Sequence, residues 1–228
     1  MMKRIPESEA ISEIADARRF NEFMGNNRFR QHEYHELAQR VAAMGIPDGG
    51  KVLDVGTGTG FVAIEVAKLL REHGVQVVGL DLSPAMLSLA AENAQRAELN
   101  GAVVWREGNA YAMPFSDGEF DAVISNDSLH HWEDPVAICN EIARVVKPGG
   151  AYLIHDSRRL EKWWPKLFAW GIGLIIPPDF RVHYWGSIRS SYTPEELEAM
   201  VAHSRLSGWR VEAGFMEIAV VRGNDEEV

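Results

Sequence analysis

Short apolar runs alternate with helix-like patterns along most of the chain. Five runs rich in Val, Ile and Leu predict buried strands. They lie at residues 51–55, 75–80, 102–105, 120–125 and 151–155. Between these runs, apolar residues recur at helical spacing, and Ser83-Pro84 and Asp134-Pro135 have the form of helix starts. Alternating strands and helices predict a parallel sheet that is covered by helices on both faces.

The C-terminal part of the chain departs from the alternation of parallel strands and helices. Thr193-Pro194-Glu195-Glu196 has the form of a capping box and predicts a helix to about Arg205. Residues 210–213 and 216–221 predict two strands on either side of Gly214, close enough to pair as a hairpin. We therefore expect an α/β, Rossmann-like sheet of seven mostly parallel strands, with helices on both faces and a C-terminal antiparallel hairpin strand.

The length of 228 residues fits a single domain, residues 1–228. Within it we expect four parts. These are an N-terminal helical cover (1–45), a ligand-binding core (46–155), an aromatic and irregular insertion (156–192) and a closing helix with two strands (193–222).

The chain is acidic, with 23 Lys and Arg residues against 33 Asp and Glu residues and a formal net charge of −10. Nucleic-acid affinity depends largely on basic side chains that neutralise phosphates, so we expect no nucleic-acid partner. Cys139 is the single cysteine, which excludes an intrachain disulfide and fits a reducing cytoplasm. The apolar stretch at residues 163–178 is too short and too interrupted to span a bilayer. We therefore expect a soluble, cytoplasmic protein without a transmembrane segment.

A glycine-rich turn follows the first predicted strand. Such a turn lets a ligand approach backbone N–H groups at the start of a helix. The dinucleotide fingerprint requires a third glycine where Phe61 stands, and Asp54 would repel a pyrophosphate, so an NAD-dependent dehydrogenase is disfavoured. Asp81 ends the second strand 21 residues after Gly60, the offset at which a carboxylate binds ribose hydroxyls.

An ordered set of motifs resembles the class I S-adenosylmethionine (SAM)-dependent methyltransferases, particularly the small-molecule branch that contains the ubiquinone and menaquinone methyltransferases. The motifs are residues 53–60, 79–83, 108–110, 121–126 and 144–150. The resemblance implies SAM as the cofactor and S-adenosylhomocysteine (SAH) as its product.

The resemblance also implies roles for individual residues. Asp54 would lie beneath the methionine moiety of SAM, Asp81 would hold the ribose diol and Leu82 would pack on the adenine. Asn126 would lie near the methionine end. The remaining cofactor contacts would be Gly56, Thr57, Gly58 and Gly60 at the methionine moiety, and Asn109 and Ala110 at the adenine edge. Asn109 departs from the Asp that is usual in the family, but its carbonyl oxygen can still accept from the adenine amine.

Two adjacent histidines follow the fourth strand. Because imidazole titrates near neutral pH, His131 is the candidate catalytic base and His130 a candidate substrate contact. Both side chains could instead bond the backbone or shape the SAM pocket. Adjacent histidines point apart, so we expect no metal site.

Aromatic residues in the insertion and charged residues near the N-terminus are the remaining candidates for the substrate pocket. Trp163, Leu167, Trp170 and Leu174 recur at helical spacing. This pattern fits either a helix packed on the sheet or a lid, with Trp164 and Trp170 toward an apolar acceptor, and leaves peripheral membrane contact open.

Arg30 could meet the methionine carboxylate of SAM, and Tyr34 could meet its sulfonium region. A solvated basic turn is the alternative for this segment.

The sequence therefore predicts a SAM-dependent methyltransferase that acts on a small-molecule acceptor, apolar or aromatic, by in-line displacement. The alternative is a non-catalytic SAM-binding sensor or accessory subunit. The acceptor atom stays open, as does the choice between a monomer and a homodimer.

Overall fold

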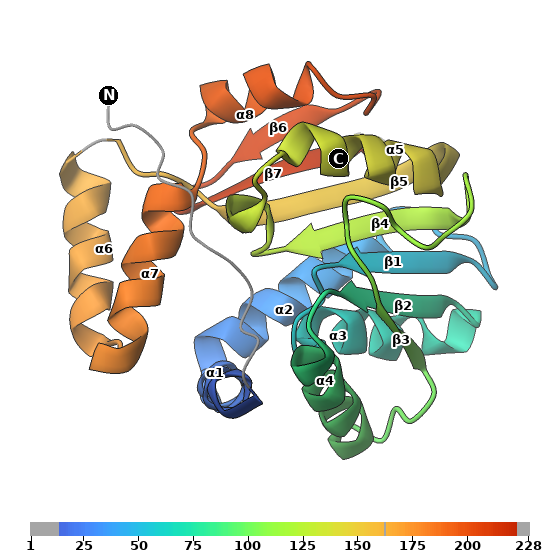
Figure 1. The fold of residues 1–228 in the computed structure, drawn as a ribbon, viewed down its shortest axis with the longest axis horizontal. Coiled ribbons are helices and arrows are strands. Elements are labelled where there is room, and N and C mark those ends of the chain that lie inside the picture. The colour runs from blue at the N-terminus through green and yellow to red at the C-terminus, as the bar shows by residue number, and fades with distance from the viewer. Residues whose placement is uncertain (1–13, 162, 223–228) are drawn as a thin grey trace.

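A computed structural model describes residues 14–161 and 163–222. Seven strands form one sheet in the order β3-β2-β1-β4-β5-β7-β6 (Figure 1). The strands are β1 (Lys51–Val55), β2 (Gln76–Asp81), β3 (Val103–Glu107), β4 (Phe120–Asn126), β5 (Val146–Ser157), β6 (Arg210–Ala213) and β7 (Glu217–Arg222).

The first five strands run parallel, and β7 lies antiparallel between β5 and β6. This arrangement confirms the predicted sheet and its C-terminal hairpin. The start of β5 differs from the prediction, because the strand begins at Val146 rather than Ala151. The pairing with β4 shifts register between Phe120 and Ala122, and this irregularity lets the Pro148-Gly149 segment run on as strand.

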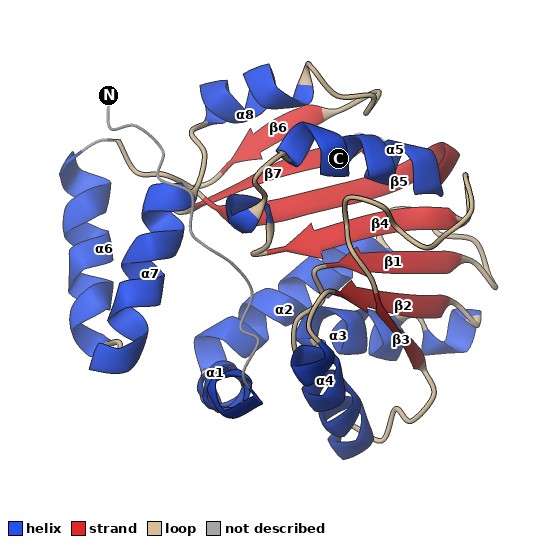
Figure 2. Ribbon diagram, in the orientation of Figure 1, coloured by secondary structure: helices blue, strands red, loops and turns tan. Residues whose placement is uncertain are grey.

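Helices cover both faces of the sheet (Figure 2). Buried side chains of α2 and α3 pack on one face, and those of α5 and α8 pack on the other. The bounds are α1 (Ile14–Asn26), α2 (Arg28–Ala42), α3 (Phe61–Leu69), α4 (Pro84–Arg96), α5 (Pro135–Val145) and α8 (Pro194–Val201), with short 3-10 turns η1 (Arg71–His73) and η2 (Leu129–His131). The last helix ends at Val201, before the predicted Arg205.

The expected N-terminal cover corresponds to α1 and α2, and residues 1–13 lie outside the described residues. The helical spacing from Trp163 to Leu174 corresponds to α6 (Trp163–Ile175), whereas the expectation of irregular structure is wrong for the second half of the insertion, which forms α7 (Pro178–Ser190). Figure 1 shows this helical hairpin standing beyond the carboxyl ends of β4 and β5. Among the described residues, no helix has the length and apolar character needed to cross a membrane.

Candidate cofactor and active site

The glycine turn lies at the carboxyl end of β1, where α3 begins. Gly56, Gly58 and Gly60 have φ values of +70°, +55° and +80°, a region that glycine adopts without strain. Two of them also sit in close packing. A Cβ on Gly56 would lie 2.3 Å from the Ser128 hydroxyl oxygen, and one on Gly60 would lie 2.5 Å from the Trp105 ring. Gly58 instead faces open space, with no atom within 4 Å of its Cβ position, which leaves room for a ligand.

Asp81 connects the ends of two neighbouring strands. Its Oδ2 accepts from the Gly58 N–H at 2.8 Å, and its Oδ1 accepts from the Ser83 N–H at 2.9 Å. Burial raises the pKa of this carboxyl, while the backbone donors lower it. A carboxylate has about four acceptor positions, so Asp81 keeps the capacity to accept from a ribose hydroxyl. The arrangement therefore fits a nucleoside placed over Gly58.

Asp54 is 2% exposed and lies beneath the turn. The Thr57 hydroxyl donates to its Oδ2 at 2.7 Å. Burial raises the pKa of Asp54 to about 7, although the bond from Thr57 opposes this shift. A bound cation close to Asp54 would favour its ionised form, and the positively charged methionine end of SAM is such a group.

The loop after β3 lies on the adenine side of the predicted site. Leu82 is 54% exposed, so its side chain is available to a ligand. Asn109 is exposed, and its Oδ1 accepts from the Tyr111 N–H at 2.9 Å. The Tyr111 hydroxyl in turn accepts from the N–H groups of Glu133 and Asp134. The predicted adenine-binding loops are therefore connected to one another by hydrogen bonds. Ala110 packs against the hydrophobic core.

A polar network closes the carboxyl ends of β4 and β5. Asn126 Oδ1 lies 2.8 Å from His155 Nδ1, and the two residues are paired in the sheet register. Asp127 follows with a φ of +49° and binds the Arg30 guanidinium of α2. Burial acts to raise the pKa of Asp127, but the charges of Arg30 and His155 hold it below its ordinary value. The network therefore ties the N-terminal cover to the edge of the sheet.

Arg30 and Tyr34 thus have protein partners of their own in this structure. Arg30 also bonds the Glu33 carboxylate at 2.9 Å, and the Tyr34 ring stacks on Phe61 at 5.5 Å between centroids. Burial raises the pKa of Tyr34 to about 12, so its hydroxyl stays protonated. The alternative of a solvated basic turn is wrong at Arg30, which lies between Asp127 and Glu33.

The two histidines lie in η2, directly after β4. His130 is 3% exposed, and its Nδ1 lies 2.7 Å from Asp156 Oδ1 while its backbone N–H donates to Asp156 Oδ2 at 2.8 Å. The His131 ring is half-buried and lies 4.0 Å from the His130 ring between centroids. Asp156 thus bonds both the ring and the backbone N–H of His130, which fixes the ring that lies against His131.

The four apolar side chains that recur at helical spacing in α6 are exposed, with Trp163 at 76% and Trp170 at 56%. Of the two alternatives for this pattern, packing of these side chains on the sheet is therefore wrong. The side chain of Trp164 lies outside the described residues.

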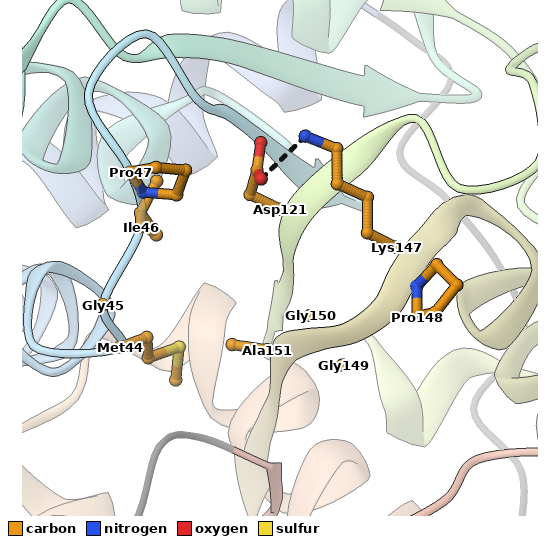
Figure 3. Close-up of a pocket in the computed structure, with 10 residues that line it drawn as sticks. All are labelled: Met44, Gly45, Ile46, Pro47, Asp121, Lys147, Pro148, Gly149, Gly150 and Ala151. Atoms are coloured by element: carbon orange, nitrogen blue, oxygen red, sulfur yellow. Dashed lines mark hydrogen bonds and ion pairs between the residues drawn. The ribbon is translucent and has the colours of Figure 1, made fainter.

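A separate hollow lies at the opposite end of the sheet (Figure 3). It has a volume of about 200 Å³ and is lined by residues 44–47, Asp121 and residues 147–151, with Lys147 Nζ bound to Asp121 at 2.7 Å. Ligands of parallel α/β sheets bind at the carboxyl ends of the strands, whereas Asp121 lies at the amino end of β4. This hollow is therefore distinct from the cofactor site.

Ser128, Asp127, His155 and Asp156 lie at the carboxyl edge of the sheet but are not among the site residues predicted from the sequence. Asp156 carries a signal that could have identified it, since it lies near the end of β5 as Asp54 and Asp81 do at β1 and β2. In the described parts of the chain, no group of three His, Cys, Asp or Glu side chains could hold a metal ion.

Comparisons with known proteins agree with this geometry. The methyltransferase domain family model matches residues 53–154. The chain is 35% identical over 191 residues to demethylmenaquinone methyltransferase of Bacillus licheniformis, with 83% of this chain and 80% of that protein covered. It is 33% identical over 195 residues to erythromycin 3''-O-methyltransferase of Saccharopolyspora erythraea, with 83% and 59% covered.

The fold agrees with that of a solved structure. A SAM-dependent methyltransferase of Aquifex aeolicus superposes with a TM-score of 0.66 at 21% identity, with 92% of this chain and 97% of that chain covered. The glycine turn and Asp81 stand in this fold at the place where a nucleoside fits. The chain therefore belongs to the class I SAM-dependent methyltransferases, in their small-molecule branch, and is an EC 2.1.1 enzyme with SAM as its cofactor.

Proposed function

We propose that this methyltransferase acts on a small apolar or aromatic acceptor of the quinol or phenol type, and that His131 accepts the proton of that acceptor. The proposed acceptor class is supported by the apolar helical hairpin α6–α7, on which Trp163 and Trp170 are exposed. This hairpin lies beyond the carboxyl edge of the sheet, which we call the cofactor edge (Figure 1). The two relatives are named for different acceptors, a demethylmenaquinone and an erythromycin oxygen. The first of these supports an apolar ring.

The residues at the cofactor edge are suited to bind and align SAM and the acceptor, and do not themselves form bonds with the methyl group. When bound, SAM supplies a methyl carbon that an acceptor lone pair attacks in line, the S–C bond breaks with its electrons left on sulfur, and SAH departs. Asp81 and the Gly58 backbone are suited to hold the nucleoside, and Asp54 is suited to face the cationic methionine end. Alignment and exclusion of water account for most of the acceleration when the methyl donor is already reactive.

His131 is the side chain suited to take the acceptor proton. It lies three residues after Ser128, whose hydroxyl abuts Gly56 of the cofactor turn. Its ring packs on His130, which Asp156 holds in place. A neutral imidazole can accept the proton of a quinol or phenol as the oxygen or ring carbon of that acceptor attacks.

A transfer assay with methyl-labelled SAM tests the acceptor class. A reduced prenyl naphthoquinone, a naphthol and a hydrophilic primary amine are compared at equal concentration. We expect label in the quinol or naphthol and none in the amine. Label in the amine alone would contradict the proposal.

Single substitutions of His131 and of a control histidine test whether His131 is the base. We expect His131→Ala to lower kcat about 100-fold or more with little change in KM, and to remove the limb of the pH–rate profile near neutrality. The matched control is His32→Ala, because His32 is exposed on α2 and pairs only with Glu36 among the described contacts. A pH–rate profile unchanged in His131→Ala would remove the base assignment.

A further inference from the structure

Among the described residues of α6, the buried ones are small or compact, and the exposed apolar side chains are large. The buried ones are Pro165, Ala169 and Gly173. A Cβ on Gly173 would lie 3.0 Å from the Trp185 ring of α7, so the two helices approach closely at this position. The opposite face of α6 carries the outer stripe, defined as Trp163, Leu167, Trp170 and Leu174, with exposed fractions of 76%, 59%, 56% and 53%.

The hairpin that presents the outer stripe is held firmly by α7. Phe180 stacks on Phe23 of α1 at 4.3 Å between ring centroids. The Tyr184 hydroxyl donates to the Ala169 carbonyl at 3.1 Å, and Arg181 donates to two carbonyls at the end of α6. These contacts hold α6 in place, with the outer stripe on its solvent-exposed side. Exposed apolar surface gathered in this way marks an interaction site.

Basic residues gather in the same segment of an acidic chain. Residues 158–190 contain six of the 23 Lys and Arg residues but two of the 33 Asp and Glu residues, a net charge of +4 in a protein of net charge −10. One of the six, Arg159, is buried and pairs with Glu196, so it adds no positive charge to the surface. Lys166 is exposed and flanks the outer stripe on α6. Tryptophan on an apolar helix face beside basic residues is the composition of a helix that lies in the headgroup region of a membrane.

We propose that the outer stripe docks this methyltransferase on the surface of an anionic lipid bilayer. The positive segment matches a negative surface, whereas a symmetric contact between two copies would bring like-charged segments together. The hairpin stands beyond the carboxyl ends of β4 and β5, so docking through it would turn the cofactor edge toward the bilayer (Figure 1). The docking and the proposed acceptor class both rest on the exposed tryptophans of α6, but their tests are separate, because vesicle binding is measured without SAM or acceptor.

Vesicle flotation with the full chain tests the proposal. The vesicles contain about 30% phosphatidylglycerol in phosphatidylcholine, with pure phosphatidylcholine for comparison. We expect binding to the anionic vesicles that weakens as salt is added. Replacing both exposed tryptophans, Trp163→Ser with Trp170→Ser, should lower the partition coefficient about tenfold or more. Lys166→Glu should lower it about fivefold or more.

Val104→Ser is the matched control, because Val104 is 43% exposed on β3, at the far edge of the sheet. This variant should bind vesicles as the wild type does. Quenching of the wild-type tryptophan fluorescence by brominated lipid provides a readout that needs no variant. The proposal is overturned by absence of that quenching, by equal losses in Val104→Ser and the tryptophan variant, or by self-association that the tryptophan variant abolishes without any vesicle binding.

Discussion

A buried carboxylate, Asp54, and a half-buried one, Asp81, lie at the ends of neighbouring strands and form the centre of the proposed cofactor site. Asp81 is already held by the backbone N–H groups of Gly58 and Ser83, so its remaining acceptor positions have fixed directions. Asp54 lies deeper and has a pKa of about 7 because burial disfavours its charge. Cofactor binding should therefore couple to the ionisation of Asp54.

We expect the affinity for SAM to rise with pH up to about 7 and to level off above it. The cationic methionine end favours ionised Asp54, so binding below this pH must release a proton. Calorimetric titration with SAM between about pH 5.5 and about pH 7.5 measures the slope. Asp54→Asn, which can still accept from Thr57, should flatten it.

The same pKa shift predicts a dependence of stability on pH. Because the folded-state pKa of Asp54 is raised above its unfolded value, this group stabilises the fold most below about pH 4, and its contribution is lost as pH rises through about 7. The free energy of unfolding, measured by denaturant titration, should fall less over this range in Asp54→Asn than in the wild type. Parallel pH profiles for the two proteins would contradict the assignment.

At the level of elements, the turn between β1 and α3 is tightly packed at one glycine and open to a ligand at another. Gly60 lies against Trp105 of β3 and Ala90 of α4, while Gly58 faces open space. The two glycines therefore have different reasons for lacking a side chain.

We expect Gly60→Ala to destabilise the fold by about 2–4 kcal/mol, because its φ of +80° and the 2.5 Å approach to Trp105 both oppose a methyl group. Gly58→Ala should cost about 1–2 kcal/mol from backbone conformation alone, yet weaken SAM binding. Gly101→Ala, at φ +77° with no neighbour within 4 Å, is the control for backbone strain without crowding. Thermal unfolding and SAM titration compare the three variants, and equal stability losses would contradict this explanation.

The elements with local signals were predictable from the sequence, and those that depend on packing were not. Ser83 and Asp134 do cap their helices, because each accepts from a backbone N–H three residues later. The second helix of the insertion was missed because Pro177-Pro178 suggests an end, whereas Pro178 begins α7. The early start of β5 was missed because Pro148-Gly149 suggests a break, which the irregular pairing with β4 accommodates.

At the scale of the whole molecule, the carboxyl edge of the sheet gathers residues from distant parts of the chain. Strand order and the glycine turn place Asp54 and Asp81 there, so both could be predicted from their positions at strand ends. The contact between Arg30 and Asp127 joins residues 97 positions apart, and that between His130 and Asp156 joins residues 26 positions apart. Such pairs depend on how α2 and η2 pack on the edge, which no local pattern encodes.

This arrangement places three functions along one side of the molecule. The glycine turn and Asp81 form the proposed cofactor site, η2 carries the proposed base, and the helical hairpin carries the proposed docking surface beyond them. The N-terminal helix α2 is tied to the same side through Arg30. Asp81, at the end of β2, is the residue that we propose holds the nucleoside of SAM.

Calorimetric titration with SAH tests whether Asp81 holds the nucleoside. The wild type should bind with a dissociation constant on the order of micromolar. Asp81→Ala should weaken binding about 100-fold, because it removes charge-assisted hydrogen bonds to the ribose and to Gly58. Asp48→Ala, an exposed carboxylate that pairs with His73, should bind as the wild type does. Undiminished SAH binding by a folded Asp81→Ala protein would contradict the account of the cofactor site.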